Sequence, residues 1–287
     1  MQRATLEEAI RRSGGVLPAG DELDRVLVKI DGLRQTGRYN RMLQQLGATN
    51  DRSNFQATLL EATFASQFEV AGAHLAYEIK QTPQTPGSVD FRHTYCADHL
   101  DFELRLVQQE YATTEQIRQQ LDQGPFFEVA MDANADLRTI VRAQNIILSK
   151  IQNPKDSTAV KFAAPQEHVT NIVVIDTHDL FLGGIDVYDC KLIAYGDPAV
   201  PEEHRRDAFG LFQQCKQDNG DQIRARYNRF SHARSTIHGL MFLFHTPGSG
   251  VFDYGLRQFT MWNPALMSRE RGIAAVAEIQ RAIPFNG

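Results

Sequence analysis

Several features are scarce in this 287-residue chain, and each absence excludes a class of protein. The three cysteines, Cys96, Cys190 and Cys215, are an odd and widely spaced set that provides no disulfide framework. No apolar run is long enough to cross a bilayer, and the first residues lack the apolar core of a signal peptide. We therefore expect a cytoplasmic protein with no membrane partner.

The chain also has fewer basic than acidic residues, with 30 Lys and Arg against 35 Asp and Glu. The formal net charge is −5 at pH 7, so no overall basic field indicates nucleic-acid binding, although an acidic chain can still carry a local basic groove. The sequence has no Gly-rich phosphate loop, no nucleophile elbow and no assembled Ser-His-Asp motif. What remains is a composition of 42% hydrophobic and 23% charged residues, which is typical of a soluble globular protein.

The central part of the chain shows an alternation of helix and strand patterns. Hydrophobic spacing predicts a helix at 55–71, capped by Asn54 and ended by Gly72. Three short strand-like runs follow at 74–80, 88–95 and 100–107, and the short turns between them favour an antiparallel meander. A further helix is expected at 137–151 and a buried strand at 171–176. These patterns predict an α/β fold with a mixed central sheet flanked by helices.

The flanking segments are expected to extend this core, which we place at 51–180 with a polar helical insertion near 108–136. Residues 1–50 have the spacing of an N-terminal helical arm. Residues 181–287 are predicted to extend the same α/β domain, with a strand at 187–195, a helix at 201–214, a hairpin of strands 237–245 and 251–262, and a closing helix at 273–283.

Acidic side chains in the central part are spaced so that the fold would gather them. Asp90, Glu103 and Arg105 alternate with apolar residues at a period of two, so neighbouring strands can bring them onto one face. Glu61 shares a side of its helix with small and apolar residues, which predicts a partly buried carboxylate in need of a partner. The alternative is a surface glutamate at the edge of the apolar stripe. Converging carboxylates suit a hard divalent cation such as Mg²⁺.

These residues also carry a resemblance. A helix with Glu61, a strand with Ser-Val-Asp at 88–90, a strand with Phe-Glu-Leu-Arg at 102–105, then a helix and a strand together resemble the PD-(D/E)XK nuclease superfamily, whose core is αβββαβ. The similarity covers roughly residues 53–178. It implies that Asp90 and Glu103 hold Mg²⁺ or Mn²⁺ and that Glu61 is the helix glutamate found in many members.

The chain departs from the family pattern at two positions. Arg105 replaces the family's lysine, and arginine can grip a phosphate but does not readily release a proton. Val89 stands where the motif has proline. Lys80, Lys150 and Lys161 are candidates for a relocated lysine.

The resemblance implies metal-dependent phosphodiester hydrolysis of nucleic acid, with a catalytic set of Glu61, Asp90, Glu103 and Arg105. The alternative is a catalytically inactive nuclease-fold protein that acts as a binding or structural subunit. The missing lysine and the acidic net charge favour that alternative. The sequence is also compatible with a homo-oligomer.

Three other clusters are candidate sites. Arg224, Arg226, Arg229 and Arg234, with Tyr227 and Phe230 among them, are typical of nucleic-acid binding or of an ordinary surface connection. The spacing of His93, Cys96 and His99 suits zinc, but no fourth ligand lies nearby in the sequence. Acidic residues around Gly183 could serve a different α/β enzyme, although their spacing does not match an EF-hand; they are Asp176, Asp179, Asp186 and Asp189.

Overall fold

The structure is a computed structural model that describes residues 1–83, 87–108, 119–120, 135–151, 153, 160–178, 185–199, 208–209 and 233–286. The expected insertion at 108–136 and the expected helix at 201–214 lie mostly outside these described residues.

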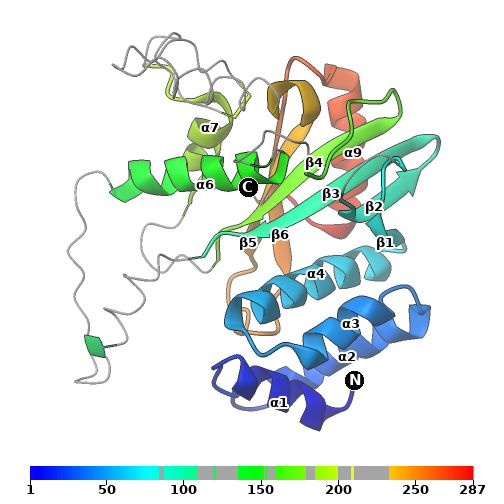
Figure 1. The fold of residues 1–287 in the computed structure, drawn as a ribbon, viewed down its shortest axis with the longest axis vertical. Coiled ribbons are helices and arrows are strands. Elements are labelled where there is room, and N and C mark those ends of the chain that lie inside the picture. The colour runs from blue at the N-terminus through cyan, green and yellow to red at the C-terminus, as the bar shows by residue number, and fades with distance from the viewer. Residues whose placement is uncertain are drawn as a thin grey trace.

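A six-stranded mixed sheet forms the centre of the molecule, with its strands in sequential order (Figure 1). The strands are β1 (Leu75–Ile79), β2 (Val89–Tyr95), β3 (Asp98–Leu106), β4 (Val169–Asp176), β5 (Gly239–His245) and β6 (Leu256–Trp262). β1, β2 and β3 form an antiparallel meander, and β5 and β6 form an antiparallel hairpin. β3, β4 and β5 are parallel, so their carboxyl ends meet at one edge of the sheet. The expected α/β class is confirmed.

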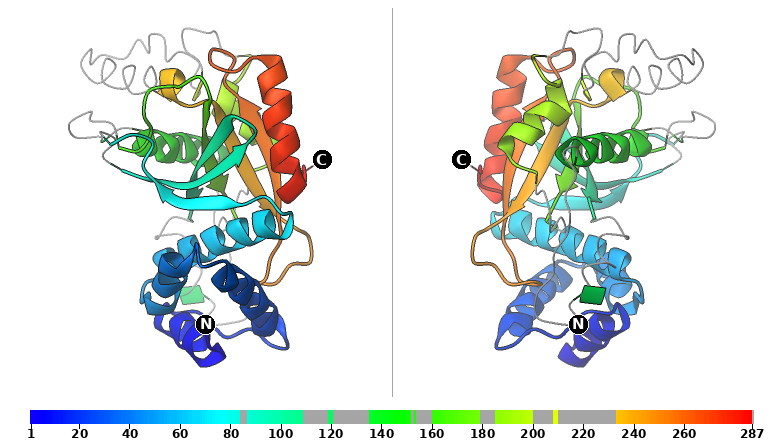
Figure 2. Two further views of the ribbon diagram at one scale, coloured as in Figure 1. Left: turned by 90° about the vertical axis from the view of Figure 1, so that its right-hand side faces the viewer. Right: turned by 90° about the vertical axis from the view of Figure 1, so that its left-hand side faces the viewer.

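Helices cover both faces of the sheet (Figures 1 and 2). α4 (Arg52–Val70) and α9 (Arg269–Ala282) pack on one face, and α1 (Arg3–Arg12), α2 (Glu22–Thr36) and α3 (Asn40–Ala48) pack beyond α4. α6 (Ala135–Ile151) and α7 (Val187–Tyr195) cover the other face. Within the described ranges, no helix is both long and apolar enough to cross a membrane.

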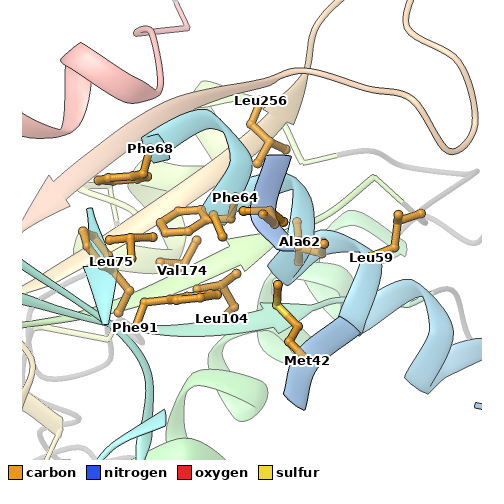
Figure 3. Close-up of a cluster of buried hydrophobic side chains, with 14 of the residues drawn as sticks. Met42, Leu59, Ala62, Phe64, Phe68, Leu75, Phe91, Leu104, Val174 and Leu256 are labelled. Carbon is orange, nitrogen blue, oxygen red and sulfur yellow. The ribbon is translucent and has the colours of Figure 1, made fainter. Parts of the chain in front are cut away.

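Aromatic packing fixes α4 on the sheet (Figure 3). The ring of Phe64 lies 5.0 Å from Phe68, 5.6 Å from Phe91 of β2 and 5.3 Å from Phe102 of β3, measured between centroids. All four rings are fully buried, and such offset and edge-on pairs add to the stabilisation from apolar burial. Because Glu61 precedes Phe64 by three residues, this packing also holds Glu61 over β2 and β3.

A second core positions α6 on the opposite face. Ile147 and Leu148 of α6 are buried in the same cluster as Val173 and Ile175 of β4. All eight residues of β4 are buried, as expected for a strand covered on both sides. Lys150, in the last turn of α6, is thereby brought to the sheet.

The predicted strand at 187–195 is wrong, because these residues form α7. The Asp186 side chain accepts a hydrogen bond from the Asp189 backbone N–H at 2.8 Å, and the Asp189 side chain accepts from the Asp186 N–H at 3.1 Å. This reciprocal capping box stabilises the start of a helix. Short apolar runs do not distinguish a buried helix from a strand, so the capping residues were the better signal.

The predicted cap of α4 also needs correction. Asp51, not Asn54, caps the helix, since the Asp51 carboxylate accepts from the Asn54 N–H at 2.8 Å. α4 therefore starts three residues earlier than expected, at Arg52, and it brings Ser53 and Asn54 to the edge of the candidate site.

Candidate functional site where β2 and β3 separate

The candidate site begins where β2 and β3 stop pairing. The last paired residues are Phe91 and Phe102, so the first part of β2 and the second part of β3 lie outside the ladder. The Asp90 carboxylate bridges this break by accepting a hydrogen bond from the Leu104 N–H at 2.7 Å. Val89 and Phe91 belong to the cores on opposite faces, so β2 twists at Asp90. Asp90 therefore projects into the break.

Glu103 is the most buried acid of the site, with a side chain 1% exposed. Its Oε1 atom accepts a hydrogen bond from the ammonium group of Lys150, on α6, and forms an ion pair with the ammonium group of Lys161 at 3.3 Å. Its Oε2 atom is buried and has no hydrogen-bond partner among the residues that the structure describes. A buried carboxylate oxygen without a partner is costly, so a cation or a hydrogen-bond donor placed at this atom would stabilise the site.

Lys161 lies between the two carboxylates. Its Nζ atom is 3.3 Å from Glu103 Oε1 and 4.0 Å from Asp90 Oδ1, and it donates to the Ser88 carbonyl at 2.8 Å. A close crossing of the chain makes this possible, because a Cβ atom on Gly87 would lie 2.6 Å from the Val160 carbonyl oxygen. Glycine at 87 thus allows the segment that carries Lys161 to approach the start of β2.

Glu61 and Arg105 complete a cavity of about 190 Å³ beside this cluster. Asp90 and Lys150 line the cavity as well, together with Ser53 and Asn54 at the start of α4. The Glu61 Oε2 atom accepts a hydrogen bond from the Tyr77 hydroxyl at 3.1 Å. Arg105 is exposed, so its guanidinium remains accessible from solvent.

The three carboxyl groups hold their protons more tightly than usual. Burial raises the pKa of Glu61 to about 8, with a further contribution from the negative charge of Asp90. Burial and the neighbouring Glu103 raise the pKa of Asp90 to about 7. Burial raises the pKa of Glu103 to about 7, although Lys161 and Arg105 oppose the shift. Crowded acids of this kind favour a cation that replaces their protons.

The donor set fits Mg²⁺ or Mn²⁺ better than zinc. In the described part of the chain, no three His, Cys, Asp or Glu side chains are arranged to hold a metal ion. Asp90 and Glu103 are a pair of carboxylates, and one buried oxygen of Glu103 has no partner within the described ranges. Mg²⁺ is commonly held by one or two carboxylates, with water and substrate phosphate as its other ligands. A zinc site would need a fuller set of protein ligands.

The structure does not bring the proposed zinc residues together. His93 pairs with Leu100 and the next residue, Thr94, pairs with His99, so the two imidazoles lie on opposite faces of the sheet. His93 Nδ1 contacts the His74 carbonyl at 3.1 Å, and His99 Nδ1 contacts the Thr94 hydroxyl at 3.0 Å. The zinc hypothesis is therefore wrong.

The other predicted clusters are only partly described. Arg224, Arg226, Arg229 and Asp179 lie outside the described residues. Arg234 lies in the short helical turn before β5, and it is not among the residues that line the carboxylate cavity. Asp186 and Asp189 are used as the helix cap described above.

Two buried acids have partners that the sequence did not reveal. Asp101 forms a two-fold ion pair with Arg92, at 2.6 and 2.8 Å, and this pair stabilises the meander rather than the cavity. Asp176 contacts His245 at 3.2 Å across the ends of β4 and β5. One sign of the second contact was present in the sequence, because Asp176 and His245 are polar residues at the carboxyl ends of two buried strands.

Comparison with known proteins adds no assignment: no family model, no curated protein and no solved structure matches this chain. Functional inference therefore depends on the geometry of the site itself.

Proposed function

We propose that this protein hydrolyses phosphodiester bonds in nucleic acid with the help of a divalent cation, as a divergent relative of the PD-(D/E)XK nucleases. The order α4-β1-β2-β3-α6-β4 is that of the αβββαβ core. The observation that carries the proposal is the meeting of Asp90 and Glu103 at the break between β2 and β3, with two lysine ammonium groups on Glu103.

Each residue has a role in this proposal. Asp90 and Glu103 would hold Mg²⁺, which when bound supplies a Lewis acid and lowers the pKa of a coordinated water. Lys150 and Arg105, both on the cavity wall, would stabilise negative charge on the phosphate. Glu61, whose pKa is about 8, holds a proton at neutral pH and would donate it during the reaction. Lys150 would thus perform the role of the family's motif lysine, whose position in the sequence is held here by Arg105.

Cleavage assays test this proposal. Labelled single-stranded and duplex DNA and RNA would be incubated with Mg²⁺ or Mn²⁺ and the wild-type protein, D90N, K150M or D98N. We expect D90N to abolish cleavage and K150M to slow it by about a hundredfold, the usual loss when one charge-stabilising group is removed. D98N is the matched control, since Asp98 lies at the opposite end of β3 and pairs with His168. Absence of cleavage, or equal activity of D90N and wild type, would refute the proposal.

One observation favours a second candidate, a non-catalytic binding or structural subunit. Lys161 lies between the two carboxylates, and the positive charges of Lys150, Lys161 and Arg105 equal in number the acids Glu61, Asp90 and Glu103. The site can therefore be neutral without a metal. A titration of the melting temperature with Mg²⁺ separates the candidates, because only a metal-dependent nuclease requires a rise that D90N removes.

A further inference from the structure

A second polar cluster lies at the carboxyl ends of β4 and β5, outside the carboxylate site. Asp176 is 1% exposed and contacts His245 Nε2 at 3.2 Å. The His245 side chain is 8% exposed, and its other ring nitrogen, Nδ1, is buried and receives no hydrogen bond from the described part of the chain. Both residues line a cavity of about 50 Å³. The cluster therefore contains a buried polar atom that a small polar group in this cavity would satisfy.

Three aromatic rings are stacked in this cluster. His245 lies between His178, at 3.5 Å with an interplanar angle of 9°, and Tyr254, at 3.9 Å with an angle of 17°. Tyr254 is buried, whereas His178 is exposed at the outer end of the stack. The Asp176 contact holds the middle ring, so His178 rests on a fixed ring pair. Such a stack presents a pre-ordered platform for another flat ring.

The stack lies on the same edge of the sheet as the carboxylate site. Asp176 of β4 pairs with Leu106 of β3, three residues beyond Glu103. Strand geometry places the backbones of Glu103 and Asp176 roughly 11 Å apart, which is about three nucleotides along a stacked strand. The two side chains leave the sheet on opposite faces, and the break between β2 and β3 opens the carboxylate cavity toward α4. Both cavities are lined by Leu106 and by the first half of α4.

Polar side chains connect the two cavities. Ser53, at the carboxylate cavity, donates to Gln108 at 2.7 Å, and Gln108 contacts Gln56, at the second cavity, at 3.5 Å. Hydroxyl and amide groups of this kind can hydrogen-bond to the sugar and phosphate groups of a nucleic acid. Ser53, Gln108 and Gln56 therefore place polar groups between the two cavities, beside the Leu106 side chain that lines both.

We propose that the stack of His178, His245 and Tyr254 binds an unpaired nucleobase two or three nucleotides from the scissile phosphate. The base stacks on His178, as bases do on exposed aromatic rings in single-strand binding proteins. The 50 Å³ cavity accommodates a water or one polar substituent, which meets His245 Nδ1. This inference rests on the proposed function, and it specifies a single-stranded or locally unpaired substrate.

The test measures binding rather than cleavage. Short single-stranded oligonucleotides carrying the fluorescent base 2-aminopurine at successive positions, and a matched duplex, would be titrated with protein in EDTA. We expect stacking to quench the fluorophore at one position, and H178A to remove this quenching and weaken single-strand binding about tenfold. H178F should restore both, because a phenyl ring also stacks. H168A is the control, since His168 is exposed and lies before the opposite end of β4.

The outcomes are distinguishable from those of the cleavage assay. Position-specific quenching that H178A removes supports the base site even if no substrate is cut. If H178A binds like H168A, or if it weakens duplex and single-strand binding equally, the base site is refuted even if cleavage occurs. Failure of H178F to restore binding would also refute stacking.

Discussion

Replacing Glu61 by glutamine should stabilise the protein, and the gain should grow as pH rises. Burial raises the pKa of Glu61 from 4.5 to about 8, and the charges of Asp90 and Glu103 add to the shift. The folded protein therefore keeps a proton on Glu61 that the unfolded chain releases near pH 4.5. Stability is lost as pH rises between these two values, because the unfolded state binds fewer protons in that range.

The size of the effect follows from the shift. Each pKa unit corresponds to about 1.4 kcal/mol, so a shift of about 3.5 units sets an upper limit near 5 kcal/mol. Part of this energy is shared with Asp90 and Glu103, which gain or lose protons in the same range. We expect E61Q to raise the free energy of unfolding by less than about 1 kcal/mol at pH 5 and by about 3 kcal/mol at pH 8.

Urea denaturation of wild type and E61Q between pH 5 and pH 8, in EDTA, measures this difference. Glu69 provides a control on the same helix, because its pKa is lowered: hydrogen bonds from Tyr39, Arg38 and His74 outweigh the effect of burial. E69Q should therefore destabilise the protein at neutral pH, and this loss should fade as pH falls below the ordinary glutamate pKa. A stability difference between E61Q and wild type that does not change between pH 5 and pH 8 would refute the assigned environment of Glu61.

Three further changes test the site and the fold. K161M should bind Mg²⁺ about tenfold more tightly than wild type, measured by calorimetry, because the metal no longer competes with an ammonium between the carboxylates; unchanged affinity would contradict this placement. G239A should cost about 1–3 kcal/mol in urea denaturation, since its Cβ would lie 2.6 Å from the Trp262 ring; a neutral effect would argue against that contact. D186A should cost about 1 kcal/mol by removing the cap shared with Asp189, and no loss would count against the capping box.

The central strands could be predicted from the sequence because the hydrophobic pattern of each strand lies within a few consecutive residues. Alternation in 88–95 and 100–107 and the continuous apolar run at 171–176 predict β2, β3 and β4, and the structure confirms them. α7 was mispredicted because nine residues with tyrosine, valine and isoleucine also suit a strand, and the capping box between Asp186 and Asp189 decided the local structure.

The candidate site could be predicted from the sequence only in part. The period-two pattern predicts that Asp90 and Glu103 are neighbours, but it does not predict the break in pairing after Phe91 and Phe102. Lysines 80, 150 and 161 were equal candidates in the sequence. The choice of Lys150 and Lys161 depends on α6 packing behind β4 and on the crossing over Gly87, both of which are tertiary contacts. The ring stack on His178 was missed because its members come from three separate segments.

The break in the β2–β3 ladder explains how groups from opposite faces of the sheet reach one point. Glu61 comes from α4 on one face and Lys150 from α6 on the other, and a continuous ladder would keep them apart. At the break, Asp90 replaces a strand–strand hydrogen bond with a bond from its own side chain to Leu104. The backbone is thereby satisfied while the carboxylate is fixed beside Glu103. The same feature that interrupts the sheet therefore builds the charged cavity, and substitution of Asp90 should affect both stability and function.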